Sequence, residues 1–269
     1  MTPTLHGIDG RQYAIYESPN NARSVLFLHG NSLSSETFAS QFVPELEKEF
    51  HLVAFDFLGH GASGNSPSPS EDYSIQGMVS QVQAVVEHLE LNKPIVIANS
   101  LGGHIALHYA SEVGDIGGIG IFGTPPLRTV ADMATAFLPT LDVGLLFKPE
   151  LTSEEALVLA KVFIQVERQE ILVQQILRTD PAFKTSLYQD ISNWSEEDEA
   201  EIVKKSGIPI LVAHGEKELG VSLEYIQQID FPTLFERKIQ VIENAFHCTQ
   251  LSQPKEFNKL LLRFFKSLA

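Results

Sequence analysis

The feature that most constrains the fold lies at residues 95–105, where a short apolar, β-branched run leads into a serine between small residues and then a helical pattern. This pattern predicts a buried strand that turns sharply into a helix, with Ser100 at the corner. At such a turn the residues two before and two after the serine lie close together, and both must be small. Ala98 and Gly102 meet that requirement. We therefore predict a nucleophile elbow, against the alternative of an ordinary strand, loop and helix with a surface serine.

Apolar runs that predict buried strands alternate with helical patterns on both sides of this turn. Besides the strand that enters the elbow, the predicted strands are 11–17, 24–28, 52–57, 116–122, 208–213 and 238–242. The first of these alternates polar and apolar side chains, which favours an edge strand. Amphipathic helices are predicted for 74–91, with Ser74 as N-cap, and for the C-terminal segment. Buried strands alternating with helices predict an α/β fold with a mostly parallel central sheet flanked by helices on both faces.

The pattern changes in residues 127–200, which contain several helical stretches and no convincing buried strand. We interpret 127–200 as a helical cap inserted into a core made of 1–126 and 201–269. A capping box of Thr152 and Glu155 predicts the start of one cap helix. The candidate pocket walls in the cap, each with plain packing as its alternative, are Phe137, Phe147, Phe163, Phe183 and Trp194. The acidic run 196–199 is expected to be the solvated start of a helix.

A serine hydroxyl becomes an effective nucleophile when an imidazole takes its proton and an acid orients that imidazole. After an elbow of this kind the acid and the histidine follow in chain order, each behind a strand. Of nine histidines, His247 lies in the loop between the last predicted strand and the last helix. The loop after the strand 208–213 offers Glu218, our choice of acid, and Glu216 as the alternative. Asp132 is the nearest acid after the preceding strand and lies too far into the cap.

The charge that develops on the carbonyl oxygen needs two backbone N–H donors. Leu101, directly after the serine, is predicted to supply one. Asn31, in the turn His29-Gly30-Asn31-Ser32, is predicted to supply the other. Cys248 adjoins the predicted base, but neighbouring residues in a loop usually point apart, so we predict that its thiol packs rather than reacts.

Two further histidines raise the question of a metal. His104 and His108 are four residues apart on a predicted helix, which would allow them to share an ion. No glutamate or third ligand accompanies them in the sequence, so we predict helix packing, no metal and no cofactor. His29 and His60 lie in glycine-containing turns and are expected to make structural hydrogen bonds.

Charge and composition limit the partners of this chain. Its net charge of −15 argues against nucleic acid and anionic membrane surfaces, which attract excess Lys and Arg. Its single cysteine excludes an internal disulfide framework, and the first ten residues lack the pattern of a secretory leader. No apolar run approaches the ~18 residues of a membrane span. We expect a cytoplasmic protein whose partner is a small molecule.

Several motifs resemble the α/β-hydrolase superfamily over nearly the whole chain outside the cap. They are His29-Gly30-Asn31-Ser32, Asp56…Gly59-His60-Gly61…Ser63, the elbow, the glutamate loop and Phe246-His247. A narrower set is similar to serine-type N-acyl-homoserine lactone lactonases of this fold: residues 100–105, 123–126, 178–180, the glutamate acid and 238–245. This resemblance implies metal-free ring opening of a bacterial signalling lactone, and therefore quorum quenching.

The resulting hypothesis is a serine hydrolase that cleaves a carboxylic ester or lactone through an acyl-enzyme. The first alternative is a general carboxylesterase for short-chain acyl esters. Two further alternatives, ranked below it, are a carbon–carbon bond hydrolase and an idle ligand receptor on the same scaffold. A dehalogenase or epoxide hydrolase of this fold would need a carboxylate where Ser100 stands. A metal-dependent lactonase would need clustered His and Asp ligands that the sequence lacks.

Overall fold

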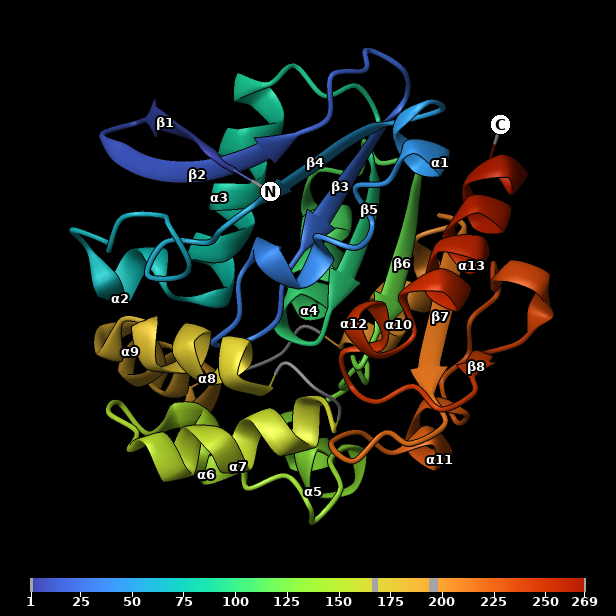
Figure 1. Ribbon diagram of the computed structural model, residues 1–269. Helices are drawn as coiled ribbons and strands as arrows, with labels where there is room; N and C mark the ends of the chain where they lie inside the picture. The colour runs from blue at the N-terminus through green and yellow to red at the C-terminus, as the bar shows by residue number, and fades with distance from the viewer. Residues whose placement is uncertain (1, 166–168, 194–197, 269) are drawn as a thin grey trace.

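The computed structural model describes residues 2–165, 169–193 and 198–268, and within them eight strands form one sheet (Figure 1). The strands are β1 (Thr4–Ile8), β2 (Arg11–Glu17), β3 (Ser24–Leu28), β4 (His51–Phe55), β5 (Ile95–Asn99), β6 (Gly118–Phe122), β7 (Ile210–Gly215) and β8 (Gln240–Ile242). Their order is β1-β2-β4-β3-β5-β6-β7-β8. From β4 to β8 neighbouring strands are parallel, whereas β2 is antiparallel to both of its neighbours. The predicted mostly parallel α/β fold is confirmed.

The expectation that residues 11–17 form an edge strand is wrong. A further strand, β1, pairs outside β2 through a tight hairpin. Its turn residues Asp9 and Gly10 have positive φ angles of 49° and 76°, which match the twist of a short hairpin. Three of the five β1 residues are exposed, so this strand lacks the apolar alternation that would have revealed it.

Helices connect and cover the strands. They are α1 (Pro44–Glu47), α2 (Pro69–Asp72), α3 (Ile75–His88), α4 (Leu101–Glu112), α5 (Met133–Ala136), α6 (Val143–Phe147), α7 (Ser153–Phe163), α8 (Gln169–Arg178), α9 (Pro181–Ser192), α10 (Glu199–Lys205), α11 (Leu223–Ile226), α12 (Thr249–Ser252) and α13 (Pro254–Ser267). The predicted N-caps are confirmed: Ser74 accepts a hydrogen bond from the Gly77 amide, and Thr152 and Glu155 form a capping box.

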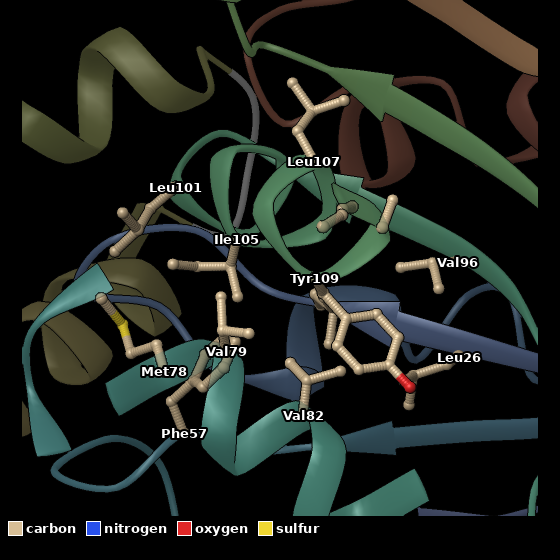
Figure 2. Packing of buried hydrophobic residues seen from close by; sticks show 14 of the residues in the cluster. Leu26, Phe57, Met78, Val79, Val82, Val96, Leu101, Ile105, Leu107 and Tyr109 are labelled. Carbon is tan, nitrogen blue, oxygen red and sulfur yellow. The ribbon is translucent and has the colours of Figure 1, made fainter. Parts of the chain in front are cut away.

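Successive side chains of the central strands enter two different cores, which is why these strands are apolar throughout. Leu26 of β3 and Val96 of β5 face the core beneath α3 and α4, and Figure 2 shows them opposite Val82 and Tyr109. The side chains between them, such as Phe27 of β3, enter the core covered by α1 and α13. Burial on both faces holds the turns at the strand ends in place.

The helices between β6 and β7 fall into two groups. In Figure 1, α5 to α9 gather past the carboxyl ends of the parallel strands, whereas α10 packs beside α4. A separate apolar cluster joins α7 and α8 to Leu33 and Cys248, which lie in the loops after β3 and β8. The helices α5 to α9 therefore lie over the carboxyl ends of the parallel strands, where the elbow is found. No helix in the described part of the chain has the length and hydropathy needed to cross a membrane.

Candidate active site

Ser100 occupies the sharp turn between β5 and α4, with φ 52° and ψ −121°, a conformation that L-residues rarely adopt. Its backbone amide donates to the Phe122 carbonyl oxygen at 2.9 Å, so the neighbouring strand supports the turn. A Cβ at Gly102 would lie 2.6 and 2.7 Å from the carbonyl oxygens of Leu28 and His29. The predicted strand, strained turn and helix are confirmed, and the requirement for glycine two residues after the serine comes from this close backbone approach.

His247 lies beside the carboxylate of Glu218. Its Nδ1 is 3.0 and 3.1 Å from the two carboxylate oxygens, and both side chains are almost completely buried. The Gly220 amide also donates to Glu218, at 2.7 Å. Burial would raise the pKa of Glu218, but His247 and the amide outweigh it and lower that pKa, so the group is a carboxylate. Glu216 is exposed and accepts instead from the Asn244 amide at 2.8 Å, so the geometry favours Glu218 as the partner of His247.

The neighbours of His247 hold its ring in one orientation. The Phe163 ring stacks on it with centroids 5.2 Å apart, and the Asn99 side chain donates to its carbonyl oxygen at 3.4 Å. A Cβ at Gly123 would lie 2.7 Å from Cε1 of the imidazole, so glycine is required there. Cys248 is buried, which raises the pKa of its thiol, and its Sγ lies 3.8 Å from the Asn99 Oδ1. The thiol packs, as the sequence predicts.

Asn31 and Leu101 flank Ser100 on the wall of one cavity. Leu101 is the first residue of α4, so its amide has no acceptor within the helix. The loop that carries Asn31 is held by His29, whose Nε2 accepts from the Phe57 amide at 3.1 Å and whose Nδ1–H donates to the Gly30 carbonyl oxygen at 2.9 Å. Burial lowers the pKa of His29, which keeps this ring neutral and its hydrogen-bonding pattern constant.

A buried carboxylate joins the loops after β3 and β4. Asp56 accepts from the Ser35 amide at 2.7 Å and from the Ala62 amide at 2.8 Å. A Cβ at Gly61 would lie 2.1 Å from its Oδ2. The close approach of Asp56 therefore explains why the second glycine of the Asp56…Gly59-His60-Gly61 motif is required.

The cavity beneath the helices α5 to α9 contains both Ser100 and His247. Among the residues that the structure describes, four polar side chains line it: Asn31, Ser100, His104 and His247. The rest of the wall is apolar and comes mostly from the segment between β6 and β7, including Met133, Phe137, Leu146, Phe147, Phe163 and Ile191. An apolar wall with a few polar groups is typical of a site for a small ligand.

Three of the five aromatic residues predicted as pocket walls, those at 137, 147 and 163, do line the cavity. Phe183 instead lies fully buried in the core, where its ring packs against His60 and Tyr73. Trp194 lies outside the described residues. Periodicity could not separate these cases because a core aromatic and a pocket aromatic have the same helical spacing.

The helix start expected in the acidic run 196–199 is confirmed, because α10 begins at Glu199 with Asp198 as its N-cap; residues 196 and 197 lie outside the described residues. Two expectations that involve Glu199 are wrong. Glu199 is not solvated: its carboxylate is completely buried and lies 2.8 Å from Nδ1 of His104 and 3.2 Å from Nε2 of His108. It also accepts from the Leu127 amide at 2.8 Å. The two histidines thus do share a glutamate, which α10 supplies 95 residues after His104 in the chain, so local spacing could not show it. No group of three or more His, Cys, Asp or Glu residues suited to a metal ion occurs in the described ranges.

This buried carboxylate predicts a specific acid sensitivity. Burial alone would raise the pKa of Glu199, but His104 and His108 lower it to about 2. Because the native pKa lies below the unfolded value, Glu199 stabilises the fold at pH values above the unfolded pKa, and this contribution is lost as pH falls toward the native pKa. Between about pH 6 and about pH 3, we expect the free energy of unfolding to drop by about 2 kcal/mol more in the wild type than in Glu199→Gln. Urea unfolding across this range measures the difference, and parallel pH profiles would contradict it.

Residues 25–260 match the model of the alpha/beta hydrolase family. Among solved structures, the N-acyl homoserine lactonase AidH complexed with N-butanoyl homoserine superposes with a TM-score of 0.94 at 26% sequence identity, covering 100% of this chain and 98% of that one.

Curated relatives extend over most of the chain as well. The monoacylglycerol lipase of Bos taurus is 24% identical, covering 95% of this chain and 79% of the lipase. The non-heme chloroperoxidase of Streptomyces lividans is 26% identical, covering 93% of this chain and 94% of that protein.

Proposed function

The chain belongs to the α/β-hydrolase family, and from that premise we propose that it is a serine hydrolase that opens the ring of N-acyl-homoserine lactones. The observation that carries this proposal is the position of Ser100 at a strained elbow in the same apolar cavity as His247, whose Nδ1 contacts the buried Glu218. The similarity to the lactonase AidH over the full chain supports the lactone as substrate. Opening the ring would inactivate a lactone that bacteria use as a signal, and this inactivation is called quorum quenching.

In the proposed mechanism the Ser100 hydroxyl attacks the lactone carbonyl while Nε2 of His247 takes its proton. Glu218 accepts from Nδ1–H of His247, which keeps Nε2 free to accept that proton and stabilises the cation that forms. The backbone amides of Asn31 and Leu101 hold the oxyanion. His247 then returns the proton to the ring oxygen, which leaves as an alcohol still tethered to the acyl group.

Water completes the reaction. His247 removes a proton from a water molecule, which attacks the acyl-enzyme and releases N-acyl-homoserine together with the free Ser100 hydroxyl. Side chains and backbone amides of this chain supply every catalytic group in these reaction steps. The proposed mechanism therefore includes neither a metal nor a cofactor.

We further propose that residues 127–200 form a cap over a core of 1–126 and 201–269, and that the cap provides the site for the acyl chain. The apolar cavity wall between β6 and β7 supports this division. The proposal places the enzyme in the cytoplasm, which the single cysteine supports because secreted proteins more often carry disulfides.

The experiment that tests the function compares kcat/KM for short- and long-chain N-acyl-homoserine lactones with kcat/KM for p-nitrophenyl acetate and butyrate. We expect a preference for the lactones, with activity unchanged by a chelator. Rapid ester hydrolysis with negligible lactone opening would identify a general carboxylesterase and contradict the lactone proposal. Turnover of neither class would contradict both hypotheses and leave a carbon–carbon bond hydrolase or an idle receptor.

A further inference from the structure

His104 is a polar side chain on the cavity wall that the proposed mechanism does not use. Asn31, Ser100 and His247 belong to the reaction, and the remaining wall of the cavity is apolar in the described part of the chain. A polar group among apolar surroundings discriminates strongly between ligands, because a ligand without a matching group leaves it desolvated and unpaired.

Glu199 determines which edge of the His104 ring is available to a ligand. Nδ1 of His104 lies 2.8 and 2.9 Å from the two oxygens of this buried carboxylate. A carboxylate only accepts, so Nδ1 carries the proton and donates it. With the proton on Nδ1, Nε2 is the acceptor whenever the ring is neutral. Glu199 also contacts His108 and the Leu127 amide, and these contacts fix its position. The carboxylate therefore keeps the His104 ring in one orientation.

The distance from His104 to the nucleophile limits where the ligand's polar group can be. Ser100 is the N-cap of α4, and His104 follows one turn later on the same side of the helix. One turn advances about 6 Å along the axis. A group bound by His104 therefore lies close to the scissile carbonyl and not at the far end of the acyl chain.

We propose that Nε2 of His104 accepts the N–H of an amide attached to the carbon next to the scissile carbonyl, and so selects α-acylamino lactones and esters over their alkyl analogues. The inference rests on the proposed hydrolase function, which it deepens by naming the residue that recognises the substrate class. His104 is a specificity-determining residue here and takes no part in proton transfer.

The test compares N-hexanoyl-homoserine lactone with α-heptyl-γ-butyrolactone, in which two methylenes replace the amide nitrogen and carbonyl. We expect His104→Leu to lower kcat/KM for the amide lactone about 10- to 100-fold and to leave the alkyl lactone little changed. His104→Gln, whose amide oxygen can accept, should restore part of the preference. If His104→Leu fails to fold beside the buried carboxylate, His104→Leu with Glu199→Gln removes that charge and provides the same comparison.

His108→Gln is the matched control. His108 lies one turn further along α4 and contacts the same carboxylate, but it is not part of the cavity wall. We expect this variant to lose stability and to keep the wild-type ratio between the two lactones. An equal fall for both lactones in His104→Leu would mean a structural role and would overturn the inference.

An open-chain pair separates failure of this inference from failure of the lactone proposal. Ethyl N-hexanoyl-glycinate and ethyl nonanoate differ by the same replacement, and their hydrolysis is followed by acid release. If the wild type opens neither lactone but prefers the glycinate in a His104-dependent manner, the lactone proposal is wrong and this inference stands. No preference within either pair overturns the inference, and no turnover of any of the four substrates overturns both.

Discussion

Replacing Ser100 by alanine is expected to lower kcat by at least about 10⁴-fold, because the attacking oxygen is removed while the cavity remains. Alanine occupies the same strained turn without a new clash, so the variant should keep its fold and still bind substrate. Pre-steady-state measurements with p-nitrophenyl butyrate should show no burst of p-nitrophenol, since no acyl-enzyme can form.

Ser111→Ala provides the control for this loss. Ser111 is an exposed residue near the other end of α4, and its removal should leave kcat and KM at wild-type values. Retention of lactone and ester hydrolysis by Ser100→Ala would show that another group is the nucleophile and would contradict the mechanism.

Glu218→Gln is expected to lower kcat by about 10³- to 10⁴-fold with little loss of stability. The Gly220 amide donates to Glu218, so the new side chain will keep its oxygen there and turn its NH₂ group toward Nδ1 of His247. An NH₂ group donates, which forces Nδ1 to accept and places the ring proton on Nε2. In that tautomer Nε2 already carries a proton and cannot accept the proton of Ser100. The positions of the side chains are therefore kept, but His247 no longer acts as the base.

Glu216→Gln tests the choice between the two glutamates. Glu216 is exposed, and its contact with the Asn244 amide requires only an acceptor, which glutamine also offers. We expect kcat within a few-fold of wild type. If Glu216→Gln abolished turnover while Glu218→Gln retained it, the acid assignment would be wrong.

Two His–Glu pairs lie near the same nucleophile, but the two pairs are built differently. His247 and Glu218 both come from loops after strands, where a ring can be aimed at the serine. His104 is fixed within α4, and its carboxylate partner is shared with His108. A carboxylate that contacts two rings suits a histidine that stays in place more than one that must shuttle a proton.

Local patterns predicted most of the fold because each depends on residues close in the chain. The elbow followed from Ser100 with Ala98 and Gly102, and the helix starts followed from side-chain caps at Ser74 and Thr152. The candidate acid and base followed from chain order, and the structure brings Glu218 to His247 as that order requires. Their catalytic roles remain predictions for the variants above.

The misses at Glu199 and Phe183 share one physical cause, which is contact between residues far apart in sequence. Glu199 belongs to an acidic run that was predicted to be solvated. In the structure α10 packs beside α4, and the contacts of Glu199 with two histidines of α4 outweigh the cost of burying its charge. Phe183 and Phe163 both lie in helical segments, yet one fills the core and the other stacks on His247. The error at residues 11–17 has a local cause instead: β1, which pairs outside them through a tight hairpin, lacks the apolar alternation that predicts a strand.

By itself, the sequence determined the α/β architecture, the strained serine turn, the candidate base and a choice between two candidate acids, because short-range periodicity, small residues and chain order encode them. The contact of His247 with Glu218, and not with Glu216, came from the tertiary structure. Only the tertiary structure decided which aromatic residues line the cavity, how His104 is oriented and that Glu199 is buried. These depend on which distant surfaces meet, and burial against a particular neighbour determines both the pKa of a carboxylate and the direction in which a ring presents its nitrogen.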